Sequence, residues 1–306
     1  MRKLLVVALV CSMLFSQPLK AQYYFYNNKY YDNAVVFEIG GTFGVMNSLT
    51  DLGGKKGVGK KFIKDLNWQN SKPSFGFYAM AMYKNMIGLR LEGTFGDIKS
   101  YDSILKNVKT TTFGRYERNL SFKSKISEFQ LALEIHPLMF KDFDGEEPPS
   151  ISPYGVIGVG YYSFDPKAKL NGQWYSLQPL HTEGQGFKEY PDRTPYKLNQ
   201  LNISAGVGVK YEINSMLNAR LEFNHRILST DYLDDVSTDY IDPGTFYTNN
   251  LPINFASIAQ QLYLRKTELN PSDMTSIGDQ RGNPKNNDAY FTIELKIGVT
   301  LGRQRR

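Results

Sequence analysis

The stretch at residues 288–301 alternates almost without fault between apolar and polar side chains. Successive side chains leave a β-strand on opposite faces, so a period of two predicts a strand. The stretch is longer than the roughly five or six residues of most soluble strands, and it covers the roughly 9–11 residues that a tilted strand needs to cross a bilayer. The alternation predicts a strand with lipid outside and an ion-paired interior. The predicted lipid face is Phe291, Ile293, Leu295, Ile297, Val299 and Leu301.

Seven earlier segments show a similar pattern and are also predicted to be strands. Their connections alternate between short and long, and the longest connection comes last. Outer-membrane barrels have an even number of strands, short periplasmic turns and long external loops. We therefore predict an all-β fold, an eight-stranded antiparallel up-and-down transmembrane β-barrel with short periplasmic turns and long extracellular loops. A soluble β-sandwich is the alternative, because it also has many alternating strands. The seven segments are 35–45, 75–84, 87–95, 128–136, 154–164, 201–210 and 219–227.

The beginning of the chain is typical of a secretory signal peptide. Arg2 and Lys3 precede an apolar run at residues 4–15, and a cleavage site follows Ala21. We predict a signal peptide at residues 1–21 and an outer-membrane barrel domain at 22–306. The remaining chain has no apolar run of about 20 residues, so no transmembrane helix is expected. A closed barrel is the β architecture that satisfies every backbone group in lipid, which places the predicted protein in the outer membrane.

Composition excludes several classes of function. Removing residues 1–21 takes away three bases and no acid, so the net charge falls from +6 to +3. A basic surface for nucleic acid is therefore not expected. The sole cysteine, Cys11, lies in the signal peptide, so disulfides, iron–sulfur clusters and thiol catalysis are excluded from the mature chain. Neither a cofactor nor a bound metal is expected.

The polar faces of the predicted strands carry charges of both signs. Eight strands enclose an interior that side chains fill, and mutual pairing offsets the desolvation of buried charges. We predict an ion-pair network in the lumen. A narrow conducting channel is the alternative. The predicted network consists of Glu38, Arg90, Glu92, Glu128, Glu134, Lys210, Arg220, Glu222, Arg226, Glu294 and Lys296.

No catalytic or metal-binding constellation emerges from the sequence, and the chain is predicted not to be an enzyme. Residues 54–60 match the first part of a phosphate-binding loop, but Lys61 stands where Ser or Thr is needed. The three histidines, His136, His181 and His225, have no spacing that suggests a Ser–His–acid site. An acidic cluster after residue 229 lacks the glycine and terminal Glu of an EF-hand, so a hydrogen-bonded turn is expected there. The cluster is Asp231, Asp234, Asp235, Asp239 and Asp242.

Two strings near the end of the chain resemble signatures of a Bacteroidota outer-membrane barrel family that includes PorG-like proteins of the type IX secretion system. The first string is TDYLDDVS at residues 230–237, and the second is RGNP at 281–284, leading through Asn287 and Asp288 into the last strand. The matching residues are Thr230, Asp231, Tyr232, Asp234, Asp235, Arg281, Gly282, Asn283, Pro284 and Asp288.

The resemblance implies a non-enzymatic barrel that anchors or helps to assemble a secretion machine. Its implied partners are periplasmic secretion-system lipoprotein or ring proteins, beside the lipid and lipopolysaccharide of the outer membrane. Two other classes of function remain open. One is a surface binding protein or adhesin acting through the long loops, and the other is the narrow channel.

Overall fold

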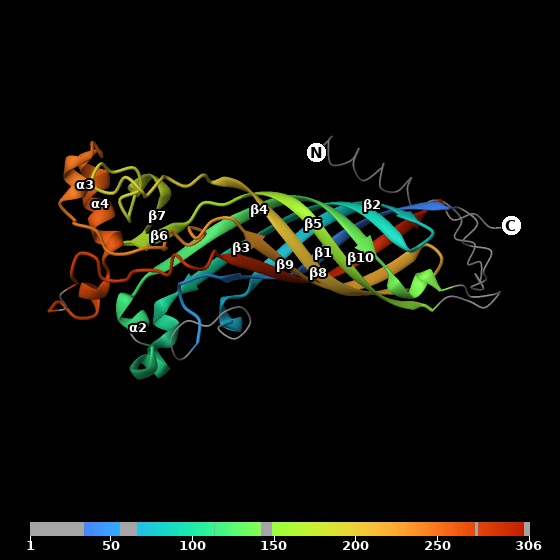
Figure 1. The fold of residues 1–306 in the computed structure, drawn as a ribbon. Coiled ribbons are helices and arrows are strands. Elements are labelled where there is room, and N and C mark those ends of the chain that lie inside the picture. Colours follow the sequence, from blue (N-terminus) through green and yellow to red (C-terminus); the bar gives the residue numbers. More distant parts are fainter. Residues whose placement is uncertain (1–33, 56–65, 113, 142–148, 273–274, 303–306) are drawn as a thin grey trace, which may run out of the picture.

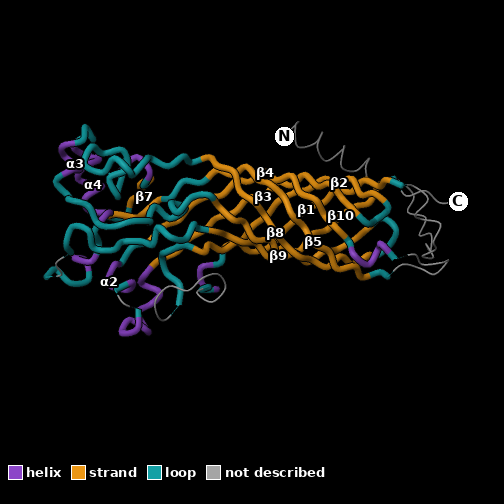
Figure 2. The backbone as a smooth tube through the Cα atoms, in the orientation of Figure 1, coloured by secondary structure: helices purple, strands orange, loops and turns teal. Residues whose placement is uncertain are grey.

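The computed structural model describes residues 34–55, 66–112, 114–141, 149–272 and 275–302. The predicted signal peptide lies outside these residues. An elongated barrel forms one part of the molecule, and a group of helices and loops covers one of its ends (Figures 1 and 2). The strands of the barrel are β1 (Val35–Leu49), β2 (Lys72–Tyr83), β3 (Ile87–Tyr101), β4 (Ser121–Ile135), β5 (Ile151–Ser163), β8 (Asn199–Glu212), β9 (Leu217–Leu228) and β10 (Ala289–Leu301).

These eight strands form one antiparallel sheet that closes on itself. The order around the barrel is β3-β2-β1-β10-β9-β8-β5-β4, and a further pairing of β3 with β4 completes the ring. That last pairing is continuous from Ile87↔Ile135 to Tyr101↔Ser121. The predicted eight-stranded antiparallel barrel is therefore confirmed. A sandwich of two sheets is excluded, because each of the eight strands has a partner on both edges.

The connections give the barrel two different ends. At the short-turn end, β2 and β3 are joined by Lys84 and Asn85, whose φ angles of 49° and 56° suit a tight hairpin turn. The turn between β8 and β9 is similarly brief. At the long-loop end, the connections after β1, β3, β5 and β9 contain all the other described elements except η5 (Pro137–Phe140), which follows β4.

The long loops pack together into a cap, and its hydrophobic core continues into the end of the barrel. Aromatic side chains from different loops meet there, as where Phe187 packs against Phe246 with ring centroids 5.9 Å apart. Within the described residues, no helix has both the length and the apolar character needed to cross a membrane. The elements of the loops are η3 (Trp68–Asn70), η4 (Asp102–Thr111), α2 (Arg115–Arg118), β6 (Lys167–Leu170), β7 (Gln173–Ser176), η6 (Gln178–Leu180), α3 (Thr245–Thr248), α4 (Ile253–Tyr263) and η7 (Lys266–Glu268).

Over most of the barrel the outward side chains are apolar and many inward side chains are polar, although inward Val36, Met80 and Met82 form a small apolar cluster. The outward residues form an apolar belt, in which side chains such as Leu91, Leu201 and Val207 are 62–67% exposed. Toward the long-loop end the belt finishes at an aromatic row, whose neighbouring rings lie 5.8–5.9 Å apart from Phe75 to Phe95 and from Phe95 to Phe129. We define the aromatic row as Phe43, Phe75, Phe95 and Phe129.

Beyond the aromatic row the pattern is inverted. On β4, Phe122 and Ile126 point inward and are buried, while Lys123 and Lys125 point outward. The predicted bounds of β3 and β4 were therefore wrong at this end. The prediction stopped β3 at Phe95 and began β4 at residue 128, because it followed an apolar outward face that ends at the belt.

One residue of the predicted lipid face has a different environment. Phe291 is only 1% exposed, because the loop after β1 folds over the outer wall at this height. The Trp68 ring packs edge-on against Phe291 at 6.1 Å, and Phe223 lies beside it at 5.5 Å. Asn47, which is opposite Phe291 in the register, donates to the carbonyl oxygen of Asn67 at 3.0 Å and fastens this loop. The prediction that lipid contacts Phe291 was wrong, since Trp68 covers it.

Candidate functional site

The inward charges of the barrel form a connected cluster. Arg90 is its centre and contacts Glu134 and Glu222 at 2.8 Å and Glu92 at 3.0 Å. Lys296 contacts Glu92, Glu222 at 3.3 Å and Glu294 at 3.4 Å. The structure thus brings together residues that come from strands far apart in the chain.

The remaining predicted lumen residues extend the cluster toward both ends of the barrel. Arg220 pairs with Glu38 at 2.8 Å and also with Glu134. Arg226 pairs with Glu128 at 3.0 Å, nearer the long-loop end. Lys210 lies 3.7 Å from Glu38 and 3.2 Å from Glu212, a residue outside the predicted set. All eleven predicted charges are between 0 and 4% exposed.

Two tyrosines complete the hydrogen bonding of these carboxylates, and the sequence analysis missed both. The Tyr78 hydroxyl donates to Glu38 at 2.5 Å, and the Tyr154 hydroxyl donates to Glu222 at 2.7 Å. The inward register of their strands was the signal that could have found them. Gly298 makes room for Tyr78, since a Cβ at Gly298 would lie 2.3 Å from the Tyr78 hydroxyl oxygen. The glycine therefore permits a dense interior.

One histidine has partners that the sequence analysis did not anticipate. His136 Nε2 lies 2.7 Å from Glu134 Oε1, and His136 Nδ1 lies 2.9 Å from Ser152 Oγ. The expectation that no spacing joins Ser, His and an acid was therefore wrong for this histidine. Ser152 is only 2% exposed, and Glu134 is already paired with two guanidinium groups. The arrangement fits a buried structural network, since a hydrolase would need its serine to meet a substrate.

The two family-like strings bind to each other at the base of the cap. The backbone N–H groups of Arg281 and Gly282 donate to the Thr238 carbonyl oxygen at 2.9 and 2.7 Å. The Asp288 carboxylate accepts from the Leu233 backbone N–H at 2.8 Å. A Cβ at Gly282 would lie 2.6–2.7 Å from the Ser237 backbone, so glycine is required there. We call residues 230–238 together with 281–288 the junction.

Side chains of the junction also reach the rest of the cap. Arg281 donates to Glu183 at 2.7 Å and to the Asp235 carbonyl oxygen at 2.8 Å. The Asp235 carboxylate accepts from Thr182 at 2.5 Å and from Tyr196 at 2.7 Å. Most residues of the two strings thus make contacts that hold the loops of the cap together. Among the other residues, Tyr232 stacks on Tyr196, Asn283 N–H donates to Asp51, Thr230 is buried and Pro284 is exposed.

Carboxyl groups accumulate in the junction without a matching number of cations. Burial raises the pKa of Asp231 to about 9 and that of Asp234 to about 8, and the nearby Asp51 carboxylate adds to both shifts. The pKa of Asp288 is also raised, first by burial and then by Asp234 and Asp231. For Asp235, burial raises the pKa to about 6 although Arg281 opposes the shift. The expected hydrogen-bonded turn is present at Asp242, which accepts from the Gly244 N–H at 2.9 Å.

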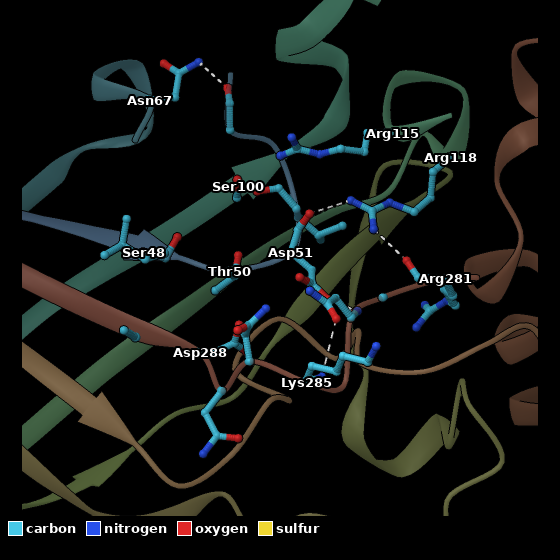
Figure 3. A pocket seen from close by; sticks show the side chains of 18 of the residues that line it. Ser48, Thr50, Asp51, Asn67, Ser100, Arg115, Arg118, Arg281, Lys285 and Asp288 are labelled. Carbon is cyan, nitrogen blue, oxygen red and sulfur yellow. Dashed lines mark hydrogen bonds between the residues drawn. The ribbon is translucent and has the colours of Figure 1, made fainter. Parts of the chain in front are cut away.

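A cavity of about 820 Å³ opens beside the junction (Figure 3). Its lining includes outward residues of the wall, such as Leu49 and Ile227, and inward residues, such as Ser48 and Asp288. The Arg118 side chain spans one side of it and donates to the backbone carbonyl oxygens of Asp51 and Arg281. The cavity is mixed in charge and has a volume suited to a small polar ligand. Its charged lining is Asp51, Arg115, Arg118, Lys266, Arg281, Lys285 and Asp288.

The structure places the two remaining histidines in separate parts of the molecule. Among the described residues, no group of three or more His, Cys, Asp and Glu side chains is placed to hold a metal ion. His181 packs against Phe187 in the cap, and His225 is half-buried on the outer wall opposite Phe291. Most of the segment resembling a phosphate-binding loop lies outside the described residues, because the structure does not describe 56–65.

No known family model and no curated protein matches the chain. Several solved structures are similar to it. OprG, an outer-membrane protein of Pseudomonas aeruginosa, is 12% identical, with 88% of this chain and 96% of that chain covered and a TM-score of 0.38. Ail, the attachment invasion locus protein of Yersinia pestis, in complex with the heparin analogue sucrose octasulfate, is 10% identical, with 87% and 97% covered and a TM-score of 0.34. Neisserial surface protein A is 8% identical, with 87% and 97% covered and a TM-score of 0.33. At these values the similarity adds nothing to what the strand pairing shows.

Proposed function

We propose that the chain is a non-enzymatic outer-membrane β-barrel that serves as a structural component in the assembly of a secretion machine, similar to PorG of the type IX system. The observation that supports a membrane location is the apolar belt around the closed barrel. Large side chains such as Phe43 and Leu201 are 66–67% exposed there, and their exposure to water would be unfavourable. A closed barrel can present such a belt to lipid because it has no unpaired edges.

The interior supports an anchoring role over conduction. The eleven predicted charges of the lumen have partners of opposite charge and are at most 4% exposed. Ions that cross a pore need a wet path, whereas these side chains fill the space that eight strands enclose. Single-channel recording in planar bilayers tests the channel alternative. The expected result is an insulating membrane, and steady conductance would overturn the anchoring role.

The assembly role draws on the family-like strings and on the short-turn end. The proposed orientation places this end in the periplasm and the cap outside the cell. At the short-turn end, η5 exposes Leu138 by 45% and Phe140 by 53%. Exposed apolar side chains can serve as contacts with a partner, which here is proposed to be a secretion-system lipoprotein or ring protein.

Gene deletion with complementation tests this role. Deletion is expected to stop the export of type IX cargo, and the wild-type gene is expected to restore it. The variant Leu138→Ser/Phe140→Ser is expected to restore export poorly at a normal barrel level. The matched control is Leu269→Ser/Ile277→Ser, which changes two apolar side chains exposed in the β9–β10 loop of the cap. Normal export after deletion would exclude the secretion role.

A surface binding protein is the second candidate, and the cavity beside the junction favours it. The cavity lies at the base of the cap and offers cations and amides from several loops. Isothermal titration of the detergent-solubilised barrel with small charged glycans would detect such a ligand. Binding that disappears in Lys285→Ala, whose side chain is exposed at the cavity, would support this function, and no heat with any probe would remove it.

A further inference from the structure

A row of lysines crosses the outer wall beyond the aromatic row. Lys99 on β3 is directly opposite Lys123 on β4, and Lys123 is directly opposite Lys167 on β6. Directly opposed residues of an antiparallel pair lie on the same face, so the three side chains leave the wall together. The inward neighbours Ile98, Phe122 and Ala168 are buried, which places the lysines on the outside. We call Lys99, Lys123 and Lys167 the lysine row.

Like charges in such a register oppose the pairing of the strands. Opposed Cβ atoms are about 4.5–5.5 Å apart, and like charges at this separation are destabilising. Lys167 has a counter-ion in Asp165 at 2.9 Å. Lys123 lies over the Trp174 ring at 3.6 Å, and Lys99 lies over the Tyr101 ring at 5.1 Å. A ring orients a cation without cancelling its charge, so the row keeps a positive surface.

Neighbouring residues add to this surface. Lys125 and Lys169 are exposed on the same wall, and Asp97 is opposite Lys125 in the register. The patch therefore contains five lysines and two aspartates. Three of the lysines belong to long strands of the barrel, so the backbone holds them at fixed positions. A rigid set of cations is suited to an anion with more than one charged group, because little conformational freedom is lost on binding.

The height of the row on the barrel identifies the layer that it meets. Lys99 follows Phe95 of the aromatic row by four residues, and Lys125 precedes Phe129 by four. Four residues of a strand tilted by about 40° rise roughly 10 Å along the barrel axis. The polar headgroup layer on each side of the hydrocarbon is about 5–8 Å thick, so side chains at this height meet its outer part. Strand β6 lies where the barrel passes into the cap (Figure 1), so the row stands between the apolar belt and the cap.

We propose that the lysine row binds the phosphate-bearing headgroups of a glycolipid in the surrounding leaflet. The apolar belt below holds the acyl chains, and the lysines above meet the phosphates. Ammonium groups form strong charge-assisted hydrogen bonds with phosphate oxygens, and an anion between opposed lysines removes their repulsion. The proposal depends on the proposed membrane location. It adds a specific lipid contact to that location and assigns it to three side chains.

The test compares the thermal unfolding of variants in detergent micelles with lipid A. The triple variant is Lys99→Gln/Lys123→Gln/Lys167→Gln, and the matched control is Lys106→Gln/Lys109→Gln/Lys188→Gln, which removes three exposed lysines of the cap. Lipid A with two phosphates is expected to raise the Tm of the wild type by about 5 °C in low salt. The control should keep this shift, and the triple variant should lose most of it.

Four further measurements make the test decisive. Without lipid A, the triple variant is expected to have the same Tm as the wild type or a higher one, because the repulsion is gone. A lower Tm would show that the lysines hold the fold and would overturn the proposal. An equal shift with dephosphorylated lipid A, or with inorganic phosphate at the same concentration, would also overturn it. Insertion of the wild type into phosphatidylcholine vesicles tests the membrane location separately, so failure there is distinguishable from failure of the lipid contact.

Discussion

The two parts of strand β4 use opposite arrangements of the same alternating pattern. From Phe129 to Ile135 the apolar side chains point outward and the acids Glu128 and Glu134 point inward. From Phe122 to Ile126 the apolar side chains point inward and lysines point outward. The first arrangement suits lipid outside, and the second suits water outside. The point of inversion, at the aromatic row, therefore marks the expected boundary of the hydrocarbon on this strand.

The lumen and the junction also differ in the surroundings of their buried acids. In the belt part, carboxylates of the lumen lie against guanidinium and ammonium groups, as Glu222 lies against Arg90 and Lys296. At the junction, Asp231 and Asp234 lie close to other carboxyl groups, and their pKa values rise to about 9 and 8. In the lumen, the carboxylates pair with cations. At the junction, burial and neighbouring carboxyl groups favour the protonated form of Asp231 and Asp234. The comparison predicts that the two regions respond differently to substitution and to pH.

The largest effect is expected from breaking the centre of the lumen network. Arg90→Met keeps the volume of the side chain but leaves the carboxylates of Glu92, Glu134 and Glu222 without their shared cation. The expected cost is about 3–5 kcal/mol, because Lys296 and Arg220 remain as the only cations beside three buried carboxylates among the described residues. Urea unfolding in phospholipid vesicles measures it. Lys84→Met, in an exposed turn, is the control, and equal midpoints for the two variants would refute the network's role.

A charge placed on the belt should have the next largest effect. Leu295 is 50% exposed on the outward face, and Leu295→Arg is expected to cost roughly 2–4 kcal/mol near the bilayer midplane. Thr292→Ser, on the inward face, should cost little because serine keeps the hydroxyl that accepts from Arg226. The same unfolding experiment compares them. If both variants unfold at the same urea concentration, the assignment of the two faces is wrong.

The dependence of stability on pH should distinguish the acids of the junction from those of the lumen. Asp231 and Asp234 have raised pKa values, so the fold binds their protons more tightly than the unfolded chain does. Their contribution to stability is fully present below the ordinary pKa of Asp, near 4, and is lost as the pH rises through about 8 and 9.

Asp231→Asn removes the charge and is therefore expected to stabilise the protein, by about 1–2 kcal/mol at pH 8 and by less at pH 5. Thermal unfolding at the two pH values measures the difference, with Asp192→Asn in an exposed loop as the control. A stabilisation that does not change with pH would contradict the raised pKa of Asp231.

The smallest effect is a difference in fluorescence between the two tryptophans. Trp68 packs on Phe291 at the outer wall, whereas Trp174 lies under Lys123 in the lysine row. Brominated acyl chains are expected to quench Trp68 more than Trp174. The single-tryptophan variants Trp174→Phe and Trp68→Phe allow each ring to be measured alone. Stronger quenching of Trp174 would place the hydrocarbon boundary beyond the lysine row.

The sequence predicts the barrel well because the belt imposes a rule on every strand. Wherever lipid is outside, apolar and polar residues must alternate, and the eight strands were found by that signal. The rule fails beyond the aromatic row, so the ends of β3 and β4 were missed. It also cannot show that a loop covers Phe291, since the contact with Trp68 joins residues 223 positions apart. The inward charges could be listed from the register, but their partners, such as Tyr78 for Glu38, require the closed barrel.

The junction gives the longest loop of the chain an anchored base. Asp288 N–H donates to the Thr230 carbonyl oxygen at 3.0 Å, and Tyr240 N–H donates to the Asp279 carbonyl oxygen at 2.8 Å, so both ends of the loop are held together before its distal part begins. The entropy lost on closing a loop grows only slowly with its length. Exposed residues of the distal part, such as Ile253 and Ile277, can therefore be exchanged at small cost to the barrel. The exposed surface of this loop can thus vary while the strand pairing of the barrel stays constant.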